Sequence, residues 1–364
     1  MARISVAILC FLAAMCASTL AAAMETRNVV LVTLDGVRWQ EFFTGADQGL
    51  LDSEEHGKLI SQVVKDTAEE RRLALMPFFW KTLAPQGMVF GNRLLQSEAK
   101  LKNPHKFSYP GYAEILLGEV LQEIDSNSKI YNRRETVLEF VRRKLKLQAL
   151  EVAAFASWDV FKYICVQEEG AVFVNAGIEK LPIFPLTDRM REIDLLQFQC
   201  LTPWDSVRHD GFTGGLAMEH LKAHGPRFLF IALDETDDWA HGDRYDRVLD
   251  GIMFADRLLA ELWSFLQSSS QYRQRTTLIV TTDHGRGNTP EDWTDHGDVP
   301  GAEDIWIAFI GPDTPDVGEV SNSEIVYQNQ TAATLLSFLG LDYREFNPNA
   351  GAPISVVLNP TEGK

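Results

Sequence analysis

Residues 28–34 read NVVLVTL, a nearly continuous apolar run that is rich in β-branched residues. Such a run is typical of a strand that is buried on both faces, as strands of a parallel sheet are. Similar runs recur at residues 88–90, 152–156, 228–233, 277–280 and 305–310. Helical patterns alternate with them, at residues 71–82, 135–147, 243–266 and 324–339. The alternation predicts an α/β fold whose central, mostly parallel sheet carries helices on both faces.

Two segments do not fit this alternation. Residues 44–70 are polar and acidic, and residues 167–215 are irregular, with scattered prolines and aromatic residues. Long irregular segments within a compact domain are often functional. We therefore expect both to be cap or insertion segments beside a site, within one catalytic domain of residues 24–364.

The composition limits the partners of the chain. Of its 364 residues 45% are hydrophobic, which is enough for a large core, and the formal net charge is −17. A surface of this charge repels nucleic acid and anionic lipid, so we expect neither as a partner. Phosphate could still bind where metal ions override the overall field.

The first residues, MARISVAILCFLAAMCASTLAAA, have the order of a secretory signal peptide: a basic residue, an apolar run and small residues. We expect cleavage near Ala22 or Ala23 and export of the rest to the periplasm or the medium. The run is short for a membrane anchor, and no later segment is long enough to span a membrane. The two remaining cysteines, Cys165 and Cys200, could form one disulfide or stay as buried thiols.

Acidic and imidazole side chains follow three of the expected strands, and a later loop adds another imidazole. Each residue taken singly has an ordinary explanation as a turn, a helix cap or a solvated side chain. Together they supply enough carboxylate and imidazole ligands for two divalent metal ions, the arrangement that serves in-line displacement at phosphorus. These residues are Asp35, Asp237, His241, Asp283, His284 and His296.

A nucleophile for that chemistry lies in residues 103–118, NPHKFSYPGYAEILLG. Ser108 comes just before an apolar helical pattern at residues 113–117, where backbone N–H groups point toward a bound anion. A nearby metal ion would lower the pKa of its hydroxyl and make it a nucleophile. The alternative is that Ser108 is an N-cap and nothing more.

In order and spacing, these motifs resemble those of the alkaline phosphatase superfamily, most closely its nucleotide pyrophosphatase/phosphodiesterase branch. The resemblance covers nearly the whole mature chain. Its motifs are LVTLDGVRWQEFF at 31–43, Ser108-Tyr109-Pro110, Asp237-x-x-x-His241, Asp283-His284-Gly285, His296-Gly297, and NQTAATLLSFLGLDY at 329–343.

The resemblance implies a site with two divalent ions, which we expect to be zinc, with manganese compatible. It assigns one ion to Asp237, His241 and His296, and the other to Asp35, Asp283, His284 and the oxygen of Ser108. It also implies a reaction in two in-line steps through a phosphoseryl enzyme. The branch commonly has Thr at the nucleophile position, so the Ser found here leaves activity on phosphate monoesters open.

Other residues are candidates for contact with the substrate. In the superfamily an Asn after the nucleophile helix often contacts the phosphoryl oxygen, and both Asn127 and Asn132 qualify. Lys106 and Arg286 could also contact substrate, and a solvated loop position is the ordinary alternative for each. The residue four after Ser108 is Tyr112 and not Arg, which argues against the sulfatase branch.

The leading interpretation is an exported metal-dependent phosphodiesterase or phosphatase that acts on a small-molecule phosphate ester. One alternative is a phosphomutase on the same fold, which a secretory leader disfavours. Another is a non-catalytic, metal-stabilised binding module of the cell envelope. The sequence leaves the oligomeric state open.

Overall fold

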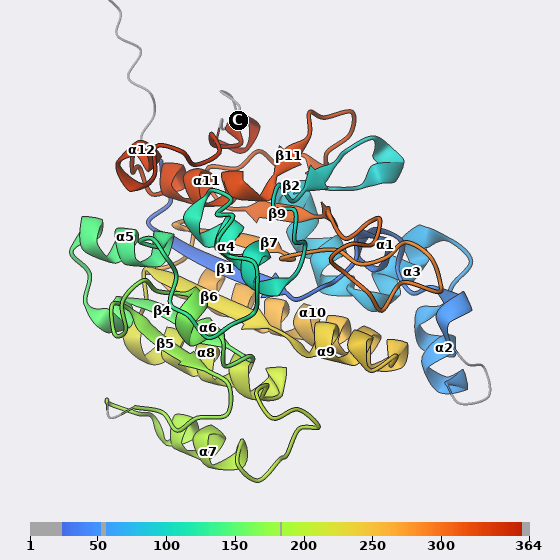
Figure 1. Ribbon diagram of the computed structural model, residues 1–364, viewed down its shortest axis with the longest axis horizontal. Coiled ribbons are helices and arrows are strands. Elements are labelled where there is room, and N and C mark those ends of the chain that lie inside the picture. Colours follow the sequence, from blue (N-terminus) through green and yellow to red (C-terminus); the bar gives the residue numbers. More distant parts are fainter. Residues whose placement is uncertain (1–23, 52–55, 183, 359–364) are drawn as a thin grey trace, which may run out of the picture.

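The computed structural model describes residues 24–51, 56–182 and 184–358, so the expected leader, residues 1–23, lies outside the described residues. Within these ranges eight strands form one sheet, in the order β10-β2-β9-β7-β1-β6-β4-β5 (Figure 1). Neighbouring strands are parallel except at β9, which runs antiparallel to β7 and β2. The predicted α/β fold with a mostly parallel sheet is therefore confirmed.

The strands of this sheet are β1 (Asn28–Leu34), β2 (Gly87–Phe90), β4 (Val152–Ala156), β5 (Phe173–Ala176), β6 (Phe228–Leu233), β7 (Thr276–Thr281), β9 (Ile307–Ile310) and β10 (Gly318–Glu319). A second, small sheet contains β3 (Ala99–Lys100), β8 (Asp304–Ile305) and β11 (Val326–Tyr327). The α-helices are α1 (Trp39–Thr44), α2 (Gly57–Val63), α3 (Ala68–Leu75), α4 (Ser108–Leu117), α5 (Val137–Leu145), α6 (Phe161–Ile164), α7 (Asp188–Leu196), α8 (Asp210–His224), α9 (Glu235–His241), α10 (Tyr245–Ser268), α11 (Thr331–Phe338) and α12 (Tyr343–Phe346).

The central strand β1 divides the core into two layers, because successive side chains of a strand point to opposite faces. Val30, Val32 and Leu34 pack into the hydrophobic cluster that includes residues of α8 and α10. Val29 and Leu31 pack into the cluster that includes residues of α4, α5 and α11. In Figure 1 these two groups of helices lie on opposite sides of the sheet, which is why the run NVVLVTL is apolar throughout.

Three predicted elements differ from the structure. The helix expected at 71–82 ends at Leu75, and a π-helical turn follows at Phe79–Leu83, because Pro77 cannot continue an α-helix. The helix expected at 324–339 starts only at Thr331, since residues 326–327 pair with β3 as strand β11. The strand expected at 305–310 is split at Trp306, whose ring stacks on Phe42 with centroids 3.7 Å apart.

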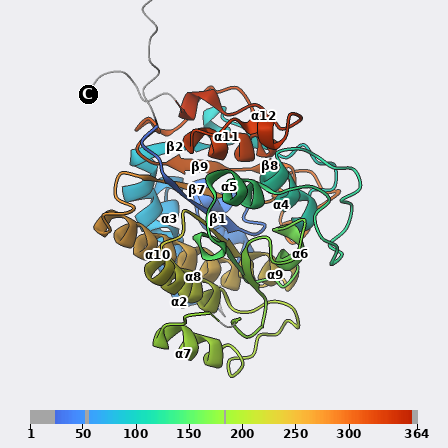
Figure 2. The ribbon, with the colours of Figure 1, turned by 90° about the vertical axis from the view of Figure 1, so that its left-hand side faces the viewer.

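The expected cap segments are only partly separate from the sheet. Residues 44–70 carry α2 and the start of α3, whereas residues 167–215 include β5, an edge strand of the main sheet. Figures 1 and 2 both show α7 at the periphery, beyond α8. In the described part of the chain, Cys165 is buried and Cys200 exposed, and both are free thiols, so the possible disulfide is not found. None of the helices in the described ranges combines the length and the hydropathy of a membrane span.

The sheet brings three strand ends together at one edge. Leu34 of β1 is paired with Leu233 of β6, and Thr33 with Thr281 of β7. The residues that follow these parallel strands are therefore neighbours, and ligands of α/β sheets collect at such carboxyl ends.

Candidate metal centre

His284 lies at the centre of the cluster at this edge. Its Nε2 is 3.3 Å from Asp35 Oδ1, 3.5 Å from Asp283 Oδ2 and 3.5 Å from Ser108 Oγ. Asp35, Asp283 and His284 are fully buried and together form a group of side chains that could hold a metal ion. This group has the members that the resemblance assigned to one ion.

A second group adjoins the first. Asp237 and His241 lie one turn apart on α9, with Asp237 Oδ2 3.2 Å from His241 Nε2. His296 approaches from the loop after β7, with its Nε2 3.0 Å from His241 Nε2 and 4.0 Å from Asp237 Oδ1. His284 Nε2 is 3.7 Å from Asp237 Oδ1, so His284 lies between the two groups. Asp237, His284 and His296 also form a group that could hold a metal ion, and His241 adjoins it through Asp237 and His296. The structure thus brings all seven expected ligand residues into one cluster.

Helix α4 positions Ser108 in this cluster. Ser108 is its first residue and is buried, and the next backbone N–H, that of Tyr109, donates to Asn127 Oδ1 at 3.0 Å. The helix can approach the end of β7 because residue 111 is glycine. A Cβ at Gly111 would lie 2.4 Å from the carbonyl oxygen of Asp283, closer than packed atoms allow.

Several observations show that these residues fit a divalent cation. Asp35 Oδ1 and Asp283 Oδ2 are buried without a hydrogen-bond donor from the described residues. Buried polar atoms are rarely left without a partner. His284 Nδ1 lies 2.9 Å from the carbonyl oxygen of Gly285, which leaves Nε2 facing the carboxylates. Metal-binding histidines commonly donate their other ring N–H in this way.

Burial and crowded charges shift the pKa values of the cluster. Burial lowers the pKa of His284, but the carboxylates of Asp283 and Asp35 outweigh it and raise the pKa to about 9. Burial and the charge of Asp35 raise the pKa of Asp283 well above its usual range. Burial lowers the pKa of both His241 and His296, which favours the neutral imidazole that binds metals. Carboxylates crowded in this way favour a bound cation, which displaces the shared protons.

Solved structures share this fold at low sequence identity. A protein of the alkaline phosphatase superfamily from Vibrio parahaemolyticus aligns with a TM-score of 0.55 at 12% identity, covering 92% of this chain and 70% of that one. The phosphonate monoester hydrolase of Silicibacter pomeroyi aligns with a TM-score of 0.57 at 12% identity, covering 93% of this chain and 78% of that one. A 2-O GAG sulfatase aligns with a TM-score of 0.57 at 12% identity, covering 93% of this chain and 76% of that one. No curated protein sequence matches the chain.

A family model describes part of the sequence directly. Residues 162–307 match the type I phosphodiesterase/nucleotide pyrophosphatase family. The rest of the resemblance lies in the fold, which the chain shares with a protein of the alkaline phosphatase superfamily. The matched span contains five of the expected metal ligands, whereas Asp35 and Ser108 precede it. The family is one of phosphoric ester hydrolases, and its match with this chain agrees with the branch named from the motifs.

The structure separates the two candidate asparagines. Asn127 is exposed and lies beside Ser108 through its bond with the N–H of Tyr109. Asn132 is buried and donates through Nδ2 to the carbonyl oxygen of Ile164 at 3.1 Å. Asn132 therefore holds the end of α6 in place, and its expected role in substrate binding does not fit this position.

The two basic candidates are engaged with protein groups. Lys106 Nζ lies 3.1 Å from Glu303 Oε2, and the carbonyl oxygen of Lys106 accepts the N–H of Gly297, next to His296. Arg286 is buried, with 2% of its surface exposed, and its guanidinium is paired with the Asp237 carboxylate. Burial lowers the pKa of Arg286 to about 10, so it stays charged at neutral pH. Its expected role in substrate contact does not fit a buried guanidinium.

Sequence reasoning missed residues that support the cluster. The Tyr112 hydroxyl donates to Asp35 Oδ2 at 2.9 Å, and its position four residues after Ser108 on one helix face was a usable signal. Burial and the charges of Asp35 and Asp238 raise the pKa of Asp234 well above its usual range. The pKa of Asp238 rises to about 6, mainly through burial. The acidic run at 234–238 was visible in the sequence, but which of its members face the cluster was not.

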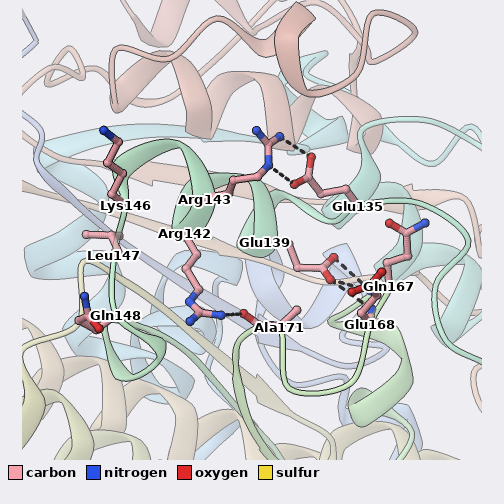
Figure 3. A pocket seen from close by; sticks show the side chains of 10 residues that line it. All are labelled: Glu135, Glu139, Arg142, Arg143, Lys146, Leu147, Gln148, Gln167, Glu168 and Ala171. Carbon is pink, nitrogen blue, oxygen red and sulfur yellow. Dashed lines mark hydrogen bonds and ion pairs between the residues drawn. The ribbon is translucent and has the colours of Figure 1, made fainter.

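A separate cleft of about 750 Å³ lies beside α5 (Figure 3). Arg143 and Glu135 form an ion pair in it at 2.7 Å. Arg142 donates to the carbonyl oxygen of Ala171. Since none of the expected ligand residues lines this cleft, we do not place the chemistry there.

Proposed function

We propose that the chain is an exported, metal-dependent hydrolase of phosphoric esters that forms a phosphoseryl intermediate on Ser108. The observation that carries this proposal is the position of the Ser108 hydroxyl, 3.5 Å from His284 Nε2 at the buried carboxylates. The match to a family of phosphoric ester hydrolases supports it. A small-molecule phosphate ester, and most readily a diester, is the proposed substrate.

Two divalent ions, zinc or alternatively manganese, would be bound by the two adjoining groups of side chains. When bound, such ions offset the negative charge of the transferring phosphoryl group and favour ionisation of the serine hydroxyl. The first group would be Asp35, Asp283, His284 and Ser108, and the second Asp237, His241 and His296.

The reacting groups of the chain then act in two displacements. Ser108 Oγ gives its proton to water and forms a bond to phosphorus, while the bond from phosphorus to the leaving alcohol oxygen breaks and that oxygen takes a proton from water. Water next attacks the phosphoserine, the bond to Oγ breaks, and the hydroxyl of Ser108 is restored. Asn127, whose Oδ1 accepts the N–H of Tyr109, would donate its amide N–H to a phosphoryl oxygen.

The test is hydrolysis of bis-p-nitrophenyl phosphate and p-nitrophenyl phosphate, with and without a chelator. We expect chelator-sensitive turnover that Ser108→Ala lowers by roughly a thousandfold or more in kcat. The metal content of that variant should stay close to that of the wild type, because three other side chains remain in its group. A covalent phosphoserine on the wild type, found by mass spectrometry after acid quench, would locate the intermediate.

The control substrate is p-nitrophenyl sulfate, because the fold is shared with a sulfatase. Turnover of the sulfate ester alone would contradict the proposal. Absence of chelator-sensitive hydrolysis across a panel of phosphate esters would favour the binding-module alternative.

Export rests on the leader composition of residues 1–23. Expression of the full chain with its leader should yield an exported protein that begins close to Met24. The mass of the mature N-terminal peptide measures this, and an intracellular protein that retains residues 1–23 would contradict export without touching the proposed chemistry.

A further inference from the structure

Arg286 is a buried cation among the proposed metal ligands, and the proposed chemistry does not use it. Its Nη2 donates to the carboxylate of Asp237 and, at 3.1 Å, to the carbonyl oxygen of the same residue. Its Nη1 donates to the carbonyl oxygen of Thr294. The guanidinium therefore contacts protein groups on two sides, and 2% exposure leaves it no open face toward a substrate.

These contacts join the three segments that carry the proposed ligands. The backbone of Arg286 directly follows the Asp283-His284-Gly285 turn after β7. Asp237 lies on α9, one turn before His241. Thr294 precedes His296 by two residues. One side chain thus fixes the relative position of a strand end, a helix and a loop.

The surroundings hold Arg286 in this position. Arg38 Nη1 donates to the carbonyl oxygen of Gly287 at 3.0 Å, and Arg38 is itself paired with Glu41. Gly36, with a φ of +60°, leaves the room that the pair needs. A Cβ there would lie 2.8 Å from Arg286 Nε and 2.8 Å from Asp237 Oδ1.

We propose that Arg286 is a positioning residue that orients the Asp237 carboxylate for metal binding. The guanidinium engages Oδ1 and leaves Oδ2 turned toward His241 Nε2, 3.2 Å away. The two oxygens of Asp237 then have fixed directions: Oδ2 faces His241, and Oδ1, which the guanidinium engages, lies 4.0 Å from His296 Nε2. The planar fork of arginine fits these contacts, whereas lysine supplies the charge without the fork. This inference rests on the proposed function in so far as a divalent ion binds here.

The experiment compares Arg286→Met and Arg286→Lys with the wild type and with Arg208→Met. Arg208 is a matched control, because it is equally buried but bonds to Asn175 and Thr213, which are not proposed ligands. Each full-length mature protein is loaded with Co²⁺, and stoichiometry, affinity by chelator competition and the visible spectrum are recorded. These readouts do not depend on turnover.

We expect Arg286→Met to bind one of the two ions roughly 10- to 100-fold more weakly, with a changed spectrum for that ion and unchanged affinity for the other. Arg286→Lys should recover part of the affinity. Arg208→Met should lower the melting temperature and leave metal binding unchanged. If Arg286→Met does not fold, Arg286→Lys carries the test, since it retains the buried charge.

Wild-type affinities and spectrum in the folded Arg286 variants would overturn the inference. An equal loss in Arg208→Met would also overturn it, because the effect would then follow from losing any buried arginine. A wild-type protein that binds no divalent ion would instead refute the proposed function, before any variant is measured.

Discussion

Tyr112 links the helix of the proposed nucleophile to a proposed metal ligand. Its hydroxyl donates to Asp35 Oδ2, and burial raises its pKa well above the usual range, which keeps the donor protonated. We expect Tyr112→Phe to weaken binding of the ion at Asp35 by roughly tenfold or more and to lower kcat, since such supporting bonds orient ligands. Chelator competition and steady-state kinetics measure the two effects.

Tyr272→Phe is the control for Tyr112→Phe. It also removes a buried tyrosine hydroxyl, which donates to the carbonyl oxygen of Pro226 at 3.0 Å. Both residues precede the strands β6 and β7, whereas the proposed ligands follow these strands. It should cost about 1 kcal/mol in the free energy of unfolding and leave metal binding unchanged. Equal metal affinities in wild type and Tyr112→Phe would contradict the role of Tyr112.

The placement of α4 depends on its contact with the end of β7. In Gly111→Ala the added methyl group would lie 2.4 Å from the Asp283 carbonyl oxygen, so the helix and Ser108 must move outward. We expect a loss of about 1–3 kcal/mol in the free energy of unfolding, typical of overpacking, together with at least tenfold lower kcat. Urea titration and ester hydrolysis measure these.

Gly211→Ala on α8 is the matched helix variant, because a Cβ there meets nothing within 4 Å. It should be neutral or stabilising by up to about 1 kcal/mol, since alanine favours the helix. A Gly111→Ala protein with wild-type kcat would show that Ser108 tolerates displacement of its helix.

Helix α8 also carries an acid-sensitive contact. His220 is buried with Nε2 2.9 Å from the carbonyl oxygen of Leu150, and burial lowers its pKa to about 4. In the unfolded chain a histidine has a pKa near 6.5. The unfolded chain therefore binds the proton more readily, so the free energy of unfolding is greatest above about pH 6.5 and falls as the pH drops toward 4.

Protonation of His220 therefore lowers the free energy of unfolding by about 3 kcal/mol at pH 4 and leaves it nearly unchanged at pH 7. Urea unfolding at pH 7 and pH 5 of the wild type and His220→Gln measures it. The variant should lose less stability between the two pH values than the wild type does. The same loss in both proteins would assign the acid sensitivity to other groups.

The elements that the sequence predicted well are those with a purely local cause. The bounds of β1, β4 and β6 agree with the apolar runs, because strands buried on both faces must be apolar at every position. The helix expected at 324–339 was wrong because residues 326–327 pair with a distant strand. The edge strand β5, which was assigned to a cap segment, has half-buried positions and no continuous apolar signal.

Across the whole molecule, the cluster of acidic side chains predicts that metal removal destabilises the fold. An ion present at about 100-fold its Kd adds about 2.7 kcal/mol to the free energy of unfolding. Chelation should therefore lower the melting temperature by roughly 5 °C, and added zinc should restore it. Differential scanning fluorimetry measures the shift. In Asp283→Asn the chelator should have a smaller effect, and an unchanged shift in that variant would exclude Asp283 as a ligand.

The fold class and the identities of the candidate ligands could be read from the chain alone. Strand burial, the Asp and His residues after three strands, and the serine before a helix are properties of short segments. Tertiary structure decided which neighbours these residues have. Asn127 and Asn132 look alike in sequence, yet only Asn127 lies beside Ser108. Arg286 has the sequence context of a solvated loop residue, whereas in the structure its guanidinium is paired with Asp237 of α9. Such contacts join residues that are far apart in the chain, and they depend on strand order and helix packing, which no local pattern encodes.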